Sequence, residues 1–196
     1  MTFANKITLF RIISVPFFVA CLIFYTPAKE HLKYLALGIF LAAIISDVID
    51  GYIARSRRQK TEAGAILDPL ADKALLLTAF IFLYRTSKMY FSISLPLWLL
   101  LTVISRDVII LVGSSILLAT HKGLQIRPTW WGKLTTFFQM CTVVAIILQF
   151  PHAWVIWWLA GIFTFISGID YAKTGINLLN NEHDTTHPKT TDRASG

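Results

Sequence analysis

The chain has 196 residues, of which 55% are hydrophobic and 15% are charged. An average soluble domain carries about 25% charged residues, and so apolar a chain cannot be disordered over most of its length. The formal net charge of +7 does not indicate a nucleic-acid partner, because the basic residues flank apolar segments, where they set membrane topology and attract anionic lipid.

Apolar segments, most of them close to the length that crosses a bilayer, predict an all-α polytopic membrane protein with six transmembrane helices. In chain order they are residues 7–25, 32–53, 70–84, 94–119, 134–150 and 154–179. The third segment is short, and we expect it to extend back through Asp68 as one helix. Arg11 interrupts the first segment and no small-residue cleavage site follows, so we interpret it as a helix rather than a signal peptide. Its first turns are expected to lie along the membrane interface.

Basic residues in the links predict the orientation, because lysine and arginine concentrate on the cytoplasmic side of a membrane protein. They are dense at the N-terminus, in the second link and in the fourth: Lys6, Arg11, Arg55, Arg57, Arg58, Lys60, Lys122, Arg127 and Lys133. The links on the other side carry fewer. Both termini and the second link are therefore predicted to face the cytoplasm.

The sequence predicts one membrane domain, residues 1–179, since it contains no internal repeat and no soluble second domain. Residues 180–196 are polar without periodicity and are predicted to form a disordered tail. Cys21 and Cys141 each lie inside an apolar run, which favours packed thiols over a disulfide or a metal site.

Four aspartates flank the second link. Asp47 and Asp50 are three positions apart, and Asp68 and Asp72 are four apart, so each pair lies on one face of its own helix. The polar segment 51–64 between them predicts a short cytoplasmic link. A helix–link–helix hairpin would then bring the two faces together and gather four carboxylates near the membrane surface.

Four neighbouring carboxylates would repel one another and take up protons unless cations balance their charge. Mg²⁺ and Mn²⁺ prefer oxygen ligands, and two such ions can share bridging carboxylates. No histidine or cysteine lies nearby in the sequence, which argues against zinc. We therefore predict a site for two Mg²⁺ or Mn²⁺ ions that holds a phosphate or a diphosphate.

Small and basic residues accompany the aspartates. Gly51, Ala54 and Gly64 would let a planar base or a diphosphate approach the helices closely, and Arg55 is placed to meet a phosphate as a forked donor. Taken singly, the small residues are better explained by helix packing, and the other basic residues of the link by membrane topology. The whole set at fixed spacing is much harder to explain in that way.

These eight residues resemble the signature of the CDP-alcohol phosphatidyltransferase family. All eight specified positions match: Asp47, Asp50, Gly51, Ala54, Arg55, Gly64, Asp68 and Asp72. The resemblance implies a six-helix membrane enzyme, usually a homodimer, that displaces CMP from a CDP-activated lipid with an alcohol. It also implies that the first three aspartates mainly bind metal, that Asp72 is the general base, and that the glycine and alanine positions line the cytidine diphosphate pocket. We count Asp72 among the metal ligands as well, and Arg55 among the residues that bind the CDP group.

Segments outside the signature bear on the acceptor alcohol. The sequence resembles the N-terminal pattern of bacterial phosphatidylglycerophosphate synthases at Asn5, Thr8, Arg11 and Pro16. Residues 132–139 (GKLTTFFQ) resemble a segment shared with CDP-alcohol-type cardiolipin synthases, and the dipeptide Arg106-Asp107 leans toward that second branch. The resemblance therefore implies transfer of the phosphatidyl group of CDP-diacylglycerol to glycerol 3-phosphate at the bacterial inner membrane. The alternative is cardiolipin synthesis with phosphatidylglycerol as acceptor, and a remote alternative is a non-enzymatic cation transporter.

Three basic residues are candidates to hold the phosphate of the acceptor: Lys133, Arg106 and Arg127. Such pairs are strong because the guanidinium or ammonium group donates charge-assisted hydrogen bonds. Taken alone, Lys133 and Arg127 are explained as interfacial anchors, and it is the signature that makes them candidates to bind the acceptor. Arg106 and Asp107 lie within an apolar run, which indicates either a structural ion pair or part of a polar cavity.

Overall fold

The computed structural model describes residues 3–57, 62–120 and 130–186; within these helices, the side chains of residues 3–8, 47–57, 62–72, 113–120, 172 and 174–186 are outside the description. This part of the chain contains six α-helices, one short 3₁₀ turn called η1 (Pro27–Lys29), and no strand. The helices are α1 (Phe3–Ile23), α2 (His31–Arg57), α3 (Glu62–Tyr90), α4 (Leu97–Thr120), α5 (Trp130–Ile147) and α6 (Ala153–Thr186). Each helix coincides with one apolar segment of the sequence, so the predicted all-α fold is confirmed.

The link that carries the predicted site is shorter than the sequence suggested. α3 runs without a break from Glu62 to Tyr90, which confirms the expected extension through Asp68. However, α2 continues to Arg57, so only residues 58–61 lie between the two helices rather than the whole segment 51–64. Alanine, arginine and glutamate are good helix formers, and polarity alone does not end a helix.

The C-terminal helix also extends further than expected. α6 continues to Thr186, so residues 180–186, which we expected in the disordered tail, are helical. Between residue 176 and Pro188 the sequence contains no glycine or proline that would end the helix. The rest of the predicted tail lies outside the described residues.

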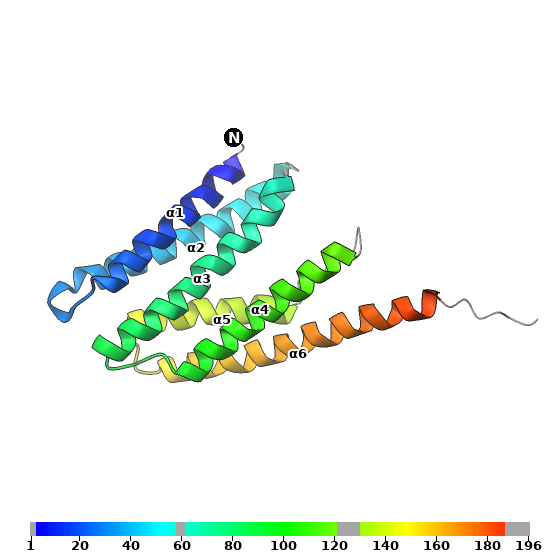
Figure 1. Cartoon of the computed structure of the whole chain (residues 1–196). Helices are drawn as coiled ribbons and strands as arrows, with labels where there is room; N and C mark the ends of the chain where they lie inside the picture. Colours follow the sequence, from blue (N-terminus) through cyan, green and yellow to red (C-terminus); the bar gives the residue numbers. More distant parts are fainter. Residues whose placement is uncertain (1–2, 58–61, 121–129, 187–196) are drawn as a thin grey trace, which may run out of the picture.

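The six helices form two groups of three. α1 packs against both α2 and α3, whereas α6 packs against both α4 and α5. α3 joins the groups by contacting α4 and α5, and α2 adds a smaller contact with α5 (Figure 1). Apolar side chains fill the interior, with Phe18 and Phe40 in ring contact at 5.6 Å and Phe80, Leu99 and Ile146 fully buried.

The side chain of Gln149 connects two interhelical links at one end of the bundle. Its side-chain carbonyl accepts a hydrogen bond from the N–H of Ile93 at 2.9 Å, and its amide donates to the carbonyl of Ile93 at 3.2 Å. The backbone of Gln149 has a φ of 55°, a left-handed conformation that is uncommon outside glycine. The side chain therefore ties the link between α5 and α6 to the link between α3 and α4.

One described stretch, Ala153–Tyr171 in α6, is long and apolar enough to cross a membrane. Two shorter apolar stretches, Leu9–Ile23 and His31–Ser46, lie in α1 and α2. The prediction of six membrane spans therefore stays a prediction, while the positions of the six helices are established.

Candidate active site

The four aspartates lie at matching positions along α2 and α3. Asp47 precedes the last residue of α2 by ten positions, and Asp72 follows the first residue of α3 by ten. At a rise of 1.5 Å per residue, both lie about 15 Å from the link, measured along the helix axes. By the same measure, Asp50 and Asp68 lie about 9–11 Å from the link.

The two aspartate pairs occupy corresponding positions on the two arms of a helical hairpin. Residues 58–61 alone connect the helices, so the ends of α2 and α3 lie within about 18 Å of each other. Figure 1 shows that α2 and α3 are antiparallel and extend from the link toward the same end of the bundle. Counted from the link, Asp47 in α2 therefore corresponds to Asp72 in α3, and Asp50 corresponds to Asp68.

Side chains at all eight signature positions are outside the described part of the chain, as is Arg127. The convergence of the four carboxylates and the CDP pocket beside them therefore stay predictions. Among the side chains that are described, no three histidine, cysteine, aspartate or glutamate residues gather in a way that could hold a metal ion. The aspartates do not belong to that set, and they remain the candidate ligands.

Arg11 of α1 is buried about one helical turn from the aspartates. It is 2% exposed and lines a small cavity whose other walls include Ala43 of α2 and Leu76 of α3. Ala43 is four positions before Asp47, and Leu76 is four after Asp72. A guanidinium stays charged and is costly to bury without anionic neighbours. The sequence marked Arg11 as an interruption of an apolar segment, but only the packing of α1 against α2 and α3 places it at this site.

A second buried polar cluster joins α3, α4 and α6. Oδ1 of Asp107 accepts hydrogen bonds from Nζ of Lys73 and from Nη1 of Arg106, the latter at 2.7 Å. Nη2 of Arg106 donates to Oγ of Ser167 at 3.0 Å, and the guanidinium lies 5.9 Å from the ring centre of Tyr171. Arg106 and Asp107 are 6% and 3% exposed. The structural ion pair that the sequence offered as one explanation of this dipeptide is therefore present.

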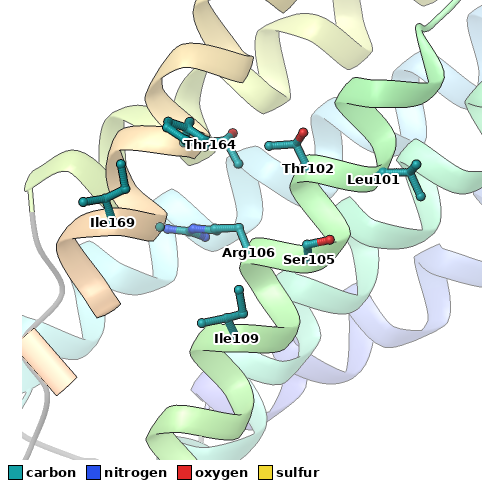
Figure 2. Close-up of a pocket in the computed structure, with 9 residues that line it drawn as sticks. Leu101, Thr102, Ser105, Arg106, Ile109, Thr164 and Ile169 are labelled. Atoms are coloured by element: carbon teal, nitrogen blue, oxygen red, sulfur yellow. The ribbon is translucent and has the colours of Figure 1, made fainter. Parts of the chain in front are cut away.

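Arg106 also lines a cavity, although its walls are mainly apolar and not polar as the second explanation expected. Figure 2 shows Arg106 extending from α4 toward α6, where Thr164 and Ile169 lie. Together these residues line a groove of about 430 Å³ between the two helices. Its remaining walls are mainly apolar and include Leu101 and Phe165, both exposed on the outside of the bundle. The guanidinium is thus the charged group of an otherwise largely apolar groove.

Measured along the helix axes, Lys133 lies near the level of the cluster around Arg106, but its ring contact is with Trp130 of its own helix. It is exposed in the first turn of α5, with Nζ 5.8 Å from the ring centre of Trp130. Oγ1 of Thr135 donates to the carbonyl of Phe163 at 2.9 Å, which sets α5 against the antiparallel α6. That pairing places Lys133 within about 3 Å of the level of Ser167 along the helix axis.

Two polar residues of the segment 132–139 hold α5 against α6. Thr135 and Gln139 are fully buried. Nε2 of Gln139 donates to Oγ1 of Thr164 at 3.1 Å, and Thr135 bonds across to α6 as described above. Buried polar groups in an apolar bundle need such partners. In the sequence these residues belonged to a segment that resembles both branches of the family, whereas their packing role depends on the register between two helices.

Fold and hairpin together define a class of protein: over the described residues, a helical bundle with paired aspartates at corresponding positions on two antiparallel helices that a short link joins. The sequence model of the CDP-alcohol phosphatidyltransferase family matches residues 1–166. The chain belongs to this family and is accordingly an enzyme of the phosphatidyltransferase type.

Curated bacterial relatives align with most of the chain. A CDP-diacylglycerol–glycerol-3-phosphate 3-phosphatidyltransferase of Haemophilus influenzae is 32% identical over 172 residues, which cover 85% of this chain and 89% of the relative. The protein of the same name from Escherichia coli K12 is 33% identical over 171 residues, covering 84% and 90%. A probable phosphatidylglycerophosphate synthase of Mycobacterium tuberculosis is 32% identical over 179 residues, covering 88% and 81%.

Proposed function

We propose that this enzyme transfers the phosphatidyl group of CDP-diacylglycerol to glycerol 3-phosphate, giving phosphatidylglycerophosphate and CMP. The observation that carries the proposal is the similarity, over more than four fifths of the chain, to bacterial enzymes named for this reaction. The matched family signature on the α2–α3 hairpin supports the same conclusion, because it contains the residues to which we assign the chemistry.

Members of this family generally depend on divalent metal ions, and the residues of the hairpin fit that requirement. Four carboxylates occur at corresponding positions on two antiparallel helices joined by a short link, and an all-oxygen donor set suits Mg²⁺ or Mn²⁺. Asp47, Asp50, Asp68 and Asp72 would hold two such ions. When bound, the ions supply positive charge that balances the diphosphate and the departing CMP.

The chain's own residues would carry out the remaining steps. Gly51, Ala54 and Gly64 leave room for the cytidine diphosphate, and Arg55 donates hydrogen bonds to its phosphates. The acceptor hydroxyl oxygen then attacks the β-phosphorus, and the bond from that phosphorus to the bridging oxygen of CMP breaks. Asp72 takes the proton that the hydroxyl loses.

Basic residues outside the α2–α3 hairpin are proposed to hold the phosphate of the acceptor. Arg106 lies buried at the interface of α4 and α6, and Lys133 lies at nearly the same height on α5. A small dianion such as glycerol 3-phosphate would gain most from two such cations. Arg127 is a third candidate. One observation favours cardiolipin synthesis as a second candidate function, namely the dipeptide Arg106-Asp107 discussed above.

The distribution of side chains supports a membrane location. Large apolar residues are exposed on the outside of the helices, among them Phe165 at 65% and Phe17 at 62%, while Gln139 and Ser167 are fully buried. A water-soluble protein normally shows the reverse pattern, whereas polar groups inside and apolar groups outside suit contact with lipid. We propose that the six helices cross the bacterial inner membrane as a homodimer, with both termini and the α2–α3 link in the cytoplasm.

The decisive experiment supplies purified enzyme in mixed micelles with CDP-diacylglycerol and either labelled glycerol 3-phosphate or labelled phosphatidylglycerol. We expect labelled phosphatidylglycerophosphate and an equal amount of CMP from the first acceptor. We expect a chelator to abolish the reaction and Mg²⁺ or Mn²⁺ to restore it. The Asp50→Asn protein serves as the control, because it removes one carboxylate and keeps the shape of the side chain.

Other outcomes would decide against the proposal in distinct ways. Labelled cardiolipin from phosphatidylglycerol alone would establish the second candidate. Absence of CMP with either acceptor would refute both and would revive the cation transporter, whose acidic site would be expected nearer the middle of the bilayer. Full activity in a metal-free preparation would refute the metal site.

A further inference from the structure

We propose that the ion pair between Lys73 and Asp107 is a positioning device for the catalytic stretch of α3. The inference rests on the proposed function, in which the neighbouring Asp72 takes the proton of the acceptor. Neither Lys73 nor Asp107 belongs to the family signature, and the ion pair has no step in the mechanism above. Both are positioning residues, which act through the helix that carries Asp68 and Asp72.

Adjacency is the first observation. Lys73 directly follows Asp72 in α3, and its Nζ is bonded to Oδ1 of Asp107 in α4, 34 positions further along the chain. The Asp107 side chain is 4% exposed and that of Lys73 is 25% exposed. This ion pair therefore connects α3 to α4 at the residue next to the proposed general base.

The anchor for this ion pair is itself held in place. Oδ1 of Asp107 also accepts from Arg106, and Arg106 donates to Ser167 of α6. The cluster thus forms a continuous line of polar contacts from α3 through α4 to α6. A displacement of α3 at Lys73 would have to break a charged contact inside the bundle.

Energetics favour a geometric role over a purely stabilising one. A buried ion pair contributes little net stability, because the cost of removing both charges from water offsets their attraction. It does impose a direction, whereas apolar packing is non-directional. Another buried side-chain bond from α3 to a neighbouring helix runs from Thr86 to the carbonyl of Leu22, about 21 Å along the axis from Asp72. Misplacement of a catalytic group by about 1 Å can cost about 100-fold in rate.

The test begins with Lys73→Met, which removes the contact between α3 and α4. It leaves the charges of Arg106 and Asp107 paired with each other. We expect kcat to fall by at least about tenfold, while KM for CDP-diacylglycerol and for glycerol 3-phosphate each change by less than about threefold. Lys73→Arg, which keeps a cation within reach of Asp107, should recover most of the lost kcat.

Thr86→Val is the matched control on the same helix. It removes a buried bond between α3 and α1 far from Asp72, so it should lower the melting temperature and leave kcat within about twofold of the wild-type value. Hydrogen exchange of residues 66–74 gives a readout that needs no activity. Lys73→Met should accelerate exchange there, and Thr86→Val should not.

Each outcome decides something. Wild-type kcat in Lys73→Met, or unchanged exchange of residues 66–74, would overturn the inference. If Lys73→Met does not fold, Asp107→Glu and Asp107→Asn replace it: the glutamate should keep kcat within about threefold and the asparagine should lose at least about tenfold. Equal kcat in those two proteins would also overturn it. An inactive wild-type enzyme would refute the proposed function, while the exchange measurement would still decide whether the ion pair holds α3.

Discussion

Asp72 is the residue on which the proposed chemistry depends most directly. Asp72→Asn keeps the shape of the side chain and removes the basic oxygen, so we expect kcat to fall by about 10²–10⁴-fold. Binding of CDP-diacylglycerol should be nearly unchanged if proton removal is the main role of this carboxylate. The measurement is single-turnover CMP release beside equilibrium binding of the CDP-lipid. A protein that binds the lipid poorly but turns over at the wild-type rate would instead make Asp72 chiefly a binding residue.

Lys133 tests the acceptor site separately from the chemistry. If its ammonium group meets the phosphate of glycerol 3-phosphate, Lys133→Ala should raise KM for that acceptor and spare KM for CDP-diacylglycerol. Loss of one charge-assisted contact of about 1.5–3 kcal/mol corresponds to a rise in KM of about 10- to 160-fold. Steady-state kinetics with each substrate varied in turn provides the check. An unchanged KM for glycerol 3-phosphate would reduce Lys133 to an interfacial anchor, in keeping with its exposed place over Trp130.

At the scale of the elements, the contact between α4 and α6 depends on a glycine. A Cβ atom at Gly161 would lie 2.6 and 2.7 Å from two ring carbons of Trp98. That indole already packs against Trp157 and Trp158, with ring centres 5.7 and 5.0 Å away, so it cannot move freely. We therefore expect Gly161→Ala to destabilise the protein by about 1–3 kcal/mol, measured as a lower melting temperature in detergent.

Gly38 in α2 provides the matched control for that change. A Cβ atom there meets nothing within 4 Å, and alanine is the better helix former by about 1 kcal/mol. Gly38→Ala should therefore leave the melting temperature unchanged or raise it. The explanation by close approach would be wrong if the two alanine substitutions had the same effect.

At the scale of the whole molecule, the expected topology follows from the number of helices and the charge of the links. With six membrane-crossing helices, both termini and the basic α2–α3 link lie on one side, and the link between α5 and α6 lies on the other. In a protein with Cys21 and Cys141 replaced by serine, a new cysteine at His152 should react with an impermeant maleimide in intact cells. A cysteine at Lys60 should react only after the membrane is opened. Labelling in the reverse order would invert the proposed orientation.

Local pattern was enough to predict the helical class and the positions of the six helices, because apolar runs of this length form helices whatever they pack against. The same is true of the aspartate pairs, since spacings of three and four residues place side chains on one face of a helix. The exact ends of α2, α3 and α6 were predicted less well. Polarity indicated a loop at residues 51–57 and a tail at residues 180–186, where helix propensity and the lack of terminating residues prevailed.

What the sequence by itself determined is therefore the family, the order of the helices and the positions of the aspartates to which we assign the chemistry. Only the tertiary structure decided which residues surround them. The bond from Lys73 to Asp107 joins positions 34 apart, and the bond from Arg106 to Ser167 joins positions 61 apart. Arg11 likewise reaches its place through the packing of three helices. Such contacts depend on how helices are rotated and shifted against one another, and no periodicity within a single segment contains that information.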